Sequence, residues 1–148
     1  MLTLAAAAAC RSSTAPAVSS PALSLEEPLA PGIAVRRVAR IAFYSDPAVV
    51  DVPAAAAVGV PLPVAVTTYG GGCVGEDTTV TFVEGLRADV VPYQRVITGN
   101  IGCTLELRIT KRQIAIVFPA AGRATVRVIG RASPGDSLVV VERGVTVR

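Results

Sequence analysis

Hydrophobic and polar residues alternate through much of the chain after residue 33, and this alternation predicts β-strands. The clearest alternation covers residues 103–110. Its hydrophobic positions are Cys103, Leu105, Leu107 and Ile109, and its polar positions are Thr104, Glu106, Arg108 and Thr110. Because successive side chains of a strand point to opposite faces, we expect the first set to face the core and the second to face solvent.

The same pattern recurs in segments that Gly and Pro separate. Strands are predicted within residues 33–44, 60–69, 79–83, 86–91, 114–118, 124–129 and 138–147, with a hairpin turn at Glu84-Gly85. No stretch of helical period is long enough for three turns. Roughly seven or eight strands at this spacing predict a single all-β domain, an antiparallel β-sandwich.

One segment carries a family resemblance. Residues 120–128 read Ala-Ala-Gly-Arg-Ala-Thr-Val-Arg-Val. They resemble the Gly-x-Ala-Thr-Val-x-Val penultimate strand of bacterial immunoglobulin-like surface domains. The resemblance implies an immunoglobulin-like sandwich over residues 33–148, and a role as a spacer, an adhesion module or a partner-binding surface.

The first ten residues form an apolar run that ends in small residues and a cysteine, Ala7-Ala8-Ala9-Cys10. This run resembles a bacterial lipoprotein signal, although Ala7 stands where Leu is usual and no basic residue precedes the run. The resemblance implies that Cys10 is lipidated and that the membrane is a partner through this lipid. Secretion without a lipid and an Ala-rich terminus of a cytoplasmic protein are the alternatives.

Residues 11–32 are rich in Pro, Ser and Ala. No apolar periodicity survives this spacing of Pro, so the segment is predicted to be an extended tether rather than a structural element. The predicted organisation is therefore a leader over residues 1–10, a tether over 11–32 and a sandwich over 33–148.

The remaining cysteines, Cys73 and Cys103, form an even pair. In an exported chain such a pair is expected to form a disulfide. Two free buried thiols are the alternative. Two cysteines without a histidine do not complete a tetrahedral metal site.

The segment between the strands at 60–69 and 79–83 is the candidate binding loop. Its residues of interest are Tyr69, Gly71, Glu76 and Asp77. The spacing of Gly70, Gly72 and Gly75 matches the dinucleotide fingerprint, but a strand follows where that fingerprint needs a helix. We therefore predict a tight loop, closed by the disulfide, in which the glycines adopt positive φ. The two adjacent carboxylates predict a solvated loop rather than a Ca²⁺ site.

Composition narrows the function. The chain has no His and a single Lys, Lys111, so the commonest general base and metal ligand are absent. The net charge is only +3 and the Arg residues are scattered without aromatic neighbours, which argues against nucleic-acid binding. We expect no enzyme activity, no cofactor and no metal.

The sequence thus predicts a non-catalytic protein of the bacterial cell envelope, lipid-anchored or secreted, that is a structural or binding module. Its expected partner is an envelope protein or polymer. Two alternatives remain open. One is a small-ligand carrier, which a closed barrel would favour. The other is a protein inhibitor that inserts loops 70–78 and 98–102 into a partner's cleft.

Overall fold

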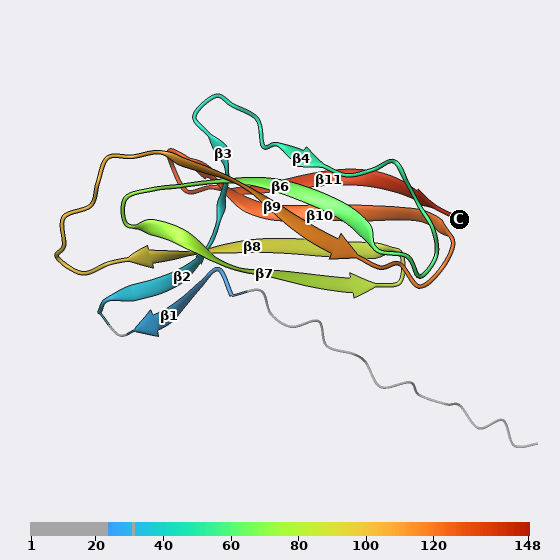
Figure 1. Ribbon diagram of the computed structural model, residues 1–148, viewed down its shortest axis with the longest axis horizontal. Coiled ribbons are helices and arrows are strands. Elements are labelled where there is room, and N and C mark those ends of the chain that lie inside the picture. The colour runs from blue at the N-terminus through green and yellow to red at the C-terminus, as the bar shows by residue number, and fades with distance from the viewer. Residues whose placement is uncertain (1–23, 31) are drawn as a thin grey trace, which may run out of the picture.

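The computed structural model describes residues 24–30 and 32–148, and these residues form an all-β sandwich of two sheets that do not close into a barrel (Figure 1). Cys10 and most of the predicted tether lie outside the described residues. Within the described part, no helix is long and apolar enough to cross a membrane.

Eleven strands are found in the described part. In chain order they are β1 (Glu26–Ala30), β2 (Ala34–Val38), β3 (Arg40–Phe43), β4 (Val50–Asp51), β5 (Ala55–Ala56), β6 (Leu62–Gly70), β7 (Val74–Glu84), β8 (Arg87–Ile97), β9 (Arg108–Ile116), β10 (Gly122–Ser133) and β11 (Leu138–Val147). The smaller sheet has the order β4-β6-β9, and the other strands form the larger sheet.

The larger sheet is organised around β8. β7 pairs along one edge of β8, while the other edge is shared by β2 and β10. The chain of β2 and β3 runs between β8 and β10, and Ala39 joins the three strands there. Its N–H donates to the carbonyl of Pro92 at 2.8 Å, and its carbonyl accepts from the N–H of Arg131 at 2.9 Å. β11 then follows β10 at the far side of the sheet.

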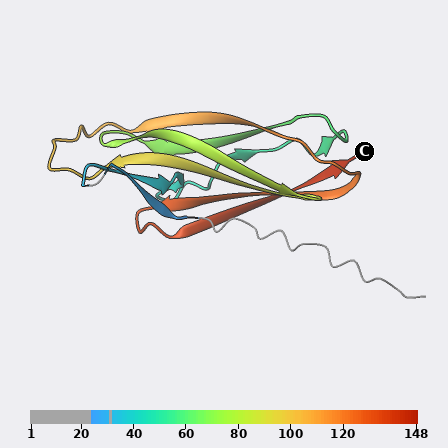
Figure 2. The same ribbon diagram turned by 90° about the horizontal axis from the view of Figure 1, so that it is seen from below.

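The two sheets lie face to face as two layers (Figure 2). Apolar side chains of both sheets meet in the core between them. The smaller sheet contributes Leu62, Val64 and Val66 from β6 and Ile116 from β9, and the larger sheet contributes Val90, Val126 and Val128 among others. The predicted inward face of 124–128 and the predicted hairpin turn at Gly85, with φ of 57°, are confirmed.

The expectation of purely antiparallel sheets is wrong at three pairs, because β10 runs parallel to both β3 and β8, and β11 runs parallel to β5. Alternation along a strand reports which side chains are buried, and it carries no information on the direction of the neighbouring strand. The strand count also exceeds the expected seven or eight, partly because β4 and β5 have only two residues each.

Part of the predicted tether is a strand. Glu26–Ala30 forms β1, which pairs antiparallel with β2 at the edge of the larger sheet. Pro28 lies within β1, and the register shifts directly after it. An edge strand tolerates proline because its outer N–H groups need no partner in the sheet, so proline spacing did not exclude this strand.

The prediction for residues 103–110 is wrong in two respects. First, the strand begins only at Arg108. Second, the side chains expected in the core face solvent: Leu105 is fully exposed, and Leu107 and Ile109 are 51% and 61% exposed. The inward positions of β9 have the opposite parity, with Arg112 and Ile116 both buried.

Gly130 in β10 offers a test of the packing between β10 and β3. A Cβ at this position would overlap the buried side chain of Ile41, with three of its carbons within 2.7 Å. We predict that Gly130→Ala lowers the free energy of unfolding by about 1–3 kcal/mol, because the added methyl group overpacks the core and displaces the side chain of Ile41. Gly144→Ala is the matched control, since no atom lies within 4 Å of its Cβ position. Urea unfolding followed by circular dichroism checks this, and equal stability of the two variants would contradict it.

Candidate functional site

The candidate site lies at the end of the sandwich where the β6–β7 turn meets the β8–β9 segment. Cys73 and Cys103 join the two at disulfide distance, with their Cα atoms 5.2 Å apart, which confirms the predicted pairing. In the chain-entropy model, closing a loop of 30 residues stabilises the fold by about 3–4 kcal/mol. The β8–β9 segment is therefore attached to the sandwich near its middle as well as at both ends.

Two glycines let these segments approach each other. Gly71 and Gly72 have φ of 121° and 57°, as predicted, whereas Gly70 and Gly75 lie in β6 and β7 without positive φ. A Cβ at Gly71 would collide with the carbonyl oxygen of Glu106, and a Cβ at Gly72 with that of Thr104. The backbone of residues 104–108 thus runs directly against the turn.

The outer surface of this segment carries an aliphatic stripe, which we define as Leu105, Leu107 and Ile109. All three side chains are more than half exposed. Their spacing of two residues places them on one side of the chain, with Glu106 and Arg108 on the other. Exposed apolar side chains that are grouped in this way are typical of interaction surfaces.

The orientation of the stripe follows from Arg112, which lies three residues after Ile109 in β9. Arg112 pairs with Val66 of β6 and its side chain enters the space between the two sheets, where it is only 8% exposed. Since neighbouring positions alternate, the inward parity of Arg112, Ile114 and Ile116 places Ile109 on the outside.

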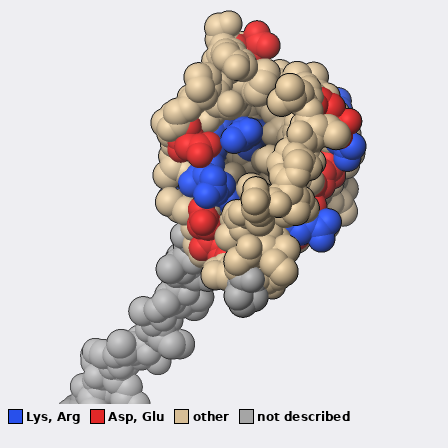
Figure 3. All heavy atoms as spheres, turned by 90° about the vertical axis from the view of Figure 1, so that its left-hand side faces the viewer, with Lys and Arg blue, Asp and Glu red and all other residues tan. Residues whose placement is uncertain are grey.

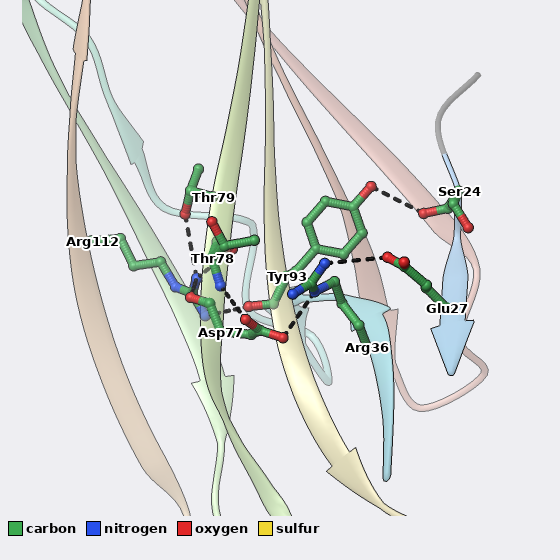
Figure 4. A network of polar contacts seen from close by, with 8 residues as sticks. All are labelled: Ser24, Glu27, Arg36, Asp77, Thr78, Thr79, Tyr93 and Arg112. Atoms are coloured by element: carbon green, nitrogen blue, oxygen red, sulfur yellow. Dashed lines mark hydrogen bonds and ion pairs between the residues drawn. The ribbon is translucent and has the colours of Figure 1, made fainter. Parts of the chain in front are cut away.

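The buried guanidinium of Arg112 is surrounded by oxygen acceptors (Figure 4). Nη2 donates to the Tyr93 carbonyl at 2.7 Å, and Nη1 donates to the carbonyls of Asp77 at 2.9 Å and Thr78 at 3.2 Å. Further bonds reach the hydroxyls of Thr68 and Thr79. Burial lowers the pKa of Arg112, and the charges of Glu76 and Asp77 oppose that shift.

These acceptors are available because β7 has a bulge. The register between β7 and β8 shifts between Glu76 and Thr79, so Asp77 and Thr78 are skipped in the pairing with β8. A buried carbonyl without a donor is costly, and Arg112 supplies the donors from the opposite sheet. The bulge and the arginine therefore stabilise each other and join the two sheets.

The carboxylate of Asp77 points to the other side of the larger sheet, where it accepts from Nε of Arg36 at 2.9 Å. Arg36 also pairs with Glu27 of β1 at 3.2 Å. Burial raises the pKa of Asp77, but the hydrogen bonds from Arg36 and from the Thr78 amide, together with the charges of Arg36 and Arg95, outweigh it, so the net shift is downward. A lowered pKa means that the stabilisation is present at neutral pH and is lost as the pH falls through that pKa.

A second group of charges surrounds a hollow at this end of the molecule (Figure 3). Arg37, Arg40 and Arg131 converge on one carboxylate, Asp136, at N–O distances of 3.6–3.9 Å. The cavity, of about 20 Å³, has room for about one water molecule. It is therefore too small for an organic ligand.

The structure separates the residues of the predicted binding loop. Tyr69 is buried, with its ring stacked on Phe43 at 5.4 Å, and Gly71 packs against Glu106. Glu76 and Asp77 were expected in the loop, but β7 already begins at Val74, so both lie in the strand. The carboxylate of Asp77 is occupied by Arg36, and only Glu76 is exposed. The loop itself shortens to residues 71–73.

Arg112 and the outward stripe are the features that sequence reasoning missed. A signal was present: the apolar positions 105–109 are odd and the apolar positions 114–118 are even. One uninterrupted strand cannot bury both runs, so one of them must face outward or lie outside the strand.

The chemical groups exposed at this end can be stated from the described residues. In the described part, no group of three or more His, Cys, Asp or Glu side chains is placed to hold a metal ion. The functional groups that this end offers are exposed aliphatic side chains, a free strand edge and ion pairs.

Comparison with known proteins adds no relative: no family model, no curated protein and no solved structure matches the chain.

Removing the buried guanidinium tests its role. We predict that Arg112→Met lowers the free energy of unfolding by about 2–4 kcal/mol, because the carbonyls of Asp77, Thr78 and Tyr93 lose their donor. Lys111→Met, at the exposed neighbouring position, is the control and should change stability by less than about 0.5 kcal/mol. Urea unfolding of both variants gives the comparison. If they are equally stable, the network does not join the sheets.

Proposed function

We propose that the protein is a non-catalytic binding module of the bacterial cell envelope, with an immunoglobulin-like sandwich tethered to the membrane through a lipid on Cys10. It binds a protein partner through the end that carries the disulfide. The observation that carries this proposal is the aliphatic stripe of Leu105, Leu107 and Ile109, which is exposed on a segment attached by the disulfide.

Two properties of the stripe support a binding role. The stripe begins in an extended segment and continues into β9, which is the last strand of the smaller sheet. An edge strand offers unpaired backbone groups to another chain, so apolar contact and strand pairing are both available. The disulfide and the glycine contacts hold the segment in place, which reduces the entropy lost on binding.

Two features support export to the envelope. The Cys73–Cys103 pair is typical of an oxidising compartment, because cytosolic thiols are kept reduced. The resemblance of residues 7–10 to a lipoprotein signal supplies the anchor. The immunoglobulin-like assignment rests on the segment 120–128, whose residues 122–128 open the second-last strand, β10.

The alternatives are less well supported. A small-ligand carrier needs an enclosed pocket, whereas the described residues form two open sheets and the charged cavity has room for only about one water. A loop-based inhibitor would use residues 70–78 and 98–102, but most of the first segment lies in β7, which begins at Val74. Its partner would be an enzyme that loses activity on binding.

Photo-cross-linking in intact cells tests the binding surface. With a photoreactive amino acid in place of Leu105, we expect specific cross-links, because this side chain is fully exposed beside the free edge. The cross-links should disappear when Leu107→Asp is added. The same amino acid in place of Val140, which is exposed on β11 of the larger sheet, is the control. Identical products from positions 105 and 140, or none from 105, would contradict the proposal.

Mass spectrometry of the membrane fraction tests the anchor separately. We expect the mature chain to begin with an acylated Cys10, since multiple acyl chains give durable attachment at about 0.8 kcal/mol per buried methylene. Cys10→Ser is the control and should leave the membrane fraction. An intact chain with Met1 in the soluble fraction of wild-type cells would contradict lipidation.

A further inference from the structure

We propose that two copies of this chain pair edge to edge through residues 104–110, in antiparallel orientation about a twofold axis at Leu107. This inference rests on the proposed function, because it names the partner of the same stripe. It is carried by the self-complementary sequence of the segment and by the unpaired edge that the segment presents.

The edge is open over the required length. β9 pairs with β6 from Ile116 to Arg108, and no described strand pairs with its other edge. Ahead of β9, the carbonyls of Thr104 and Glu106 face the Gly71-Gly72 turn. In an extended chain the backbone groups of successive residues point to opposite edges, so those of Leu105, Leu107 and Ile109 face away from β6. They are available to a second chain.

The side chains match when the axis passes through Leu107. The segment reads Thr104-Leu105-Glu106-Leu107-Arg108-Ile109-Thr110. In this register Thr104 lies opposite Thr110, Leu105 opposite Ile109, and Glu106 opposite Arg108, each twice by symmetry. Hydroxyl, aliphatic and oppositely charged cross-strand pairs are all favourable combinations.

Neighbouring registers do not match. An axis at Glu106 would place two glutamates opposite each other, and an axis at Arg108 would do the same with two arginines. Like charges directly opposite each other are destabilising. An axis between Leu107 and Arg108 would set Leu107 against Arg108 and Glu106 against Ile109. The charges therefore favour the axis at Leu107 over these neighbouring registers.

The two faces of the pair have different roles. One face would join both copies of the stripe, Leu105, Leu107 and Ile109, into a patch of six aliphatic side chains that contact one another across the pair. The other face would carry two Glu106–Arg108 pairs. Within one chain Arg108 Nη2 already lies 3.1 Å from Glu106 Oε1, with both side chains more than half exposed. Exposed ion pairs contribute little energy, so the aliphatic face supplies affinity and the charges supply register.

Charge exchange tests this register. The oligomeric state of the full chain is measured by analytical ultracentrifugation over a concentration series. We expect a dimer whose dissociation constant rises about tenfold or more in Glu106→Arg and in Arg108→Glu, because each places two like-charged pairs across the axis. The double variant restores opposite charges and should return to within about threefold of wild type. Circular dichroism checks that the variants are folded.

A cysteine pair supplies a second measurement. Leu107→Cys lies on the axis, so it should form an intermolecular disulfide on oxidation, since directly opposite Cα atoms are about 5.5 Å apart. Leu105→Cys is the matched control, because its counterpart lies four residues away along the strand. Cys10 is replaced by Ser in both.

The outcomes separate this inference from the proposed function. A monomer at all concentrations, or equal cross-linking of the position 105 and 107 cysteines, overturns the self-pairing. If the photo-cross-links at position 105 then capture a different protein, the binding function stands with another partner. If they capture nothing, both fail.

Discussion

The buried guanidinium of Arg112 is the interaction on which the rest of the structure depends. A charged group between two sheets is costly unless every donor finds an acceptor, and here carbonyls of two strands and two hydroxyls supply them. The bulge of β7 lies opposite Arg112, and its residues Asp77 and Thr78 supply two of these carbonyls. The arginine therefore determines both how the sheets are joined and which face of β9 points inward.

The aliphatic stripe on the surface follows from the inward orientation of Arg112. Once Arg112 and Ile116 face the core, Ile109 must face solvent, and the aliphatic stripe follows along the same parity. The disulfide and the Gly71-Gly72 turn then hold residues 104–108 against the sandwich. The need of the buried Arg112 guanidinium for hydrogen-bond acceptors thus accounts for the exposed aliphatic stripe.

Local pattern predicted the fold class, the β7–β8 hairpin and the disulfide, because each depends on short-range alternation, on a turn glycine or on an even cysteine pair. It failed at β9, where two apolar runs of opposite parity compete and a distant bulge decides between them. It also failed at Pro28, whose tolerance depends on an edge position. The binding-loop prediction was wrong for Glu76 and Asp77, because both already lie within β7. These three predictions failed because the structure of each segment depends on strands that are distant in the sequence.

The most direct test of this account is the NMR spectrum of the Arg112 guanidinium in the ¹⁵N-arginine-labelled chain. The buried network predicts slowly exchanging, individually resolved Nε–H and Nη–H signals that show cross-relaxation with protons of Tyr93 and Thr79. A rapidly exchanging, averaged Nη signal like that of an exposed arginine would contradict it. In that case the orientation of β9, and with it the origin of the stripe, would need another cause.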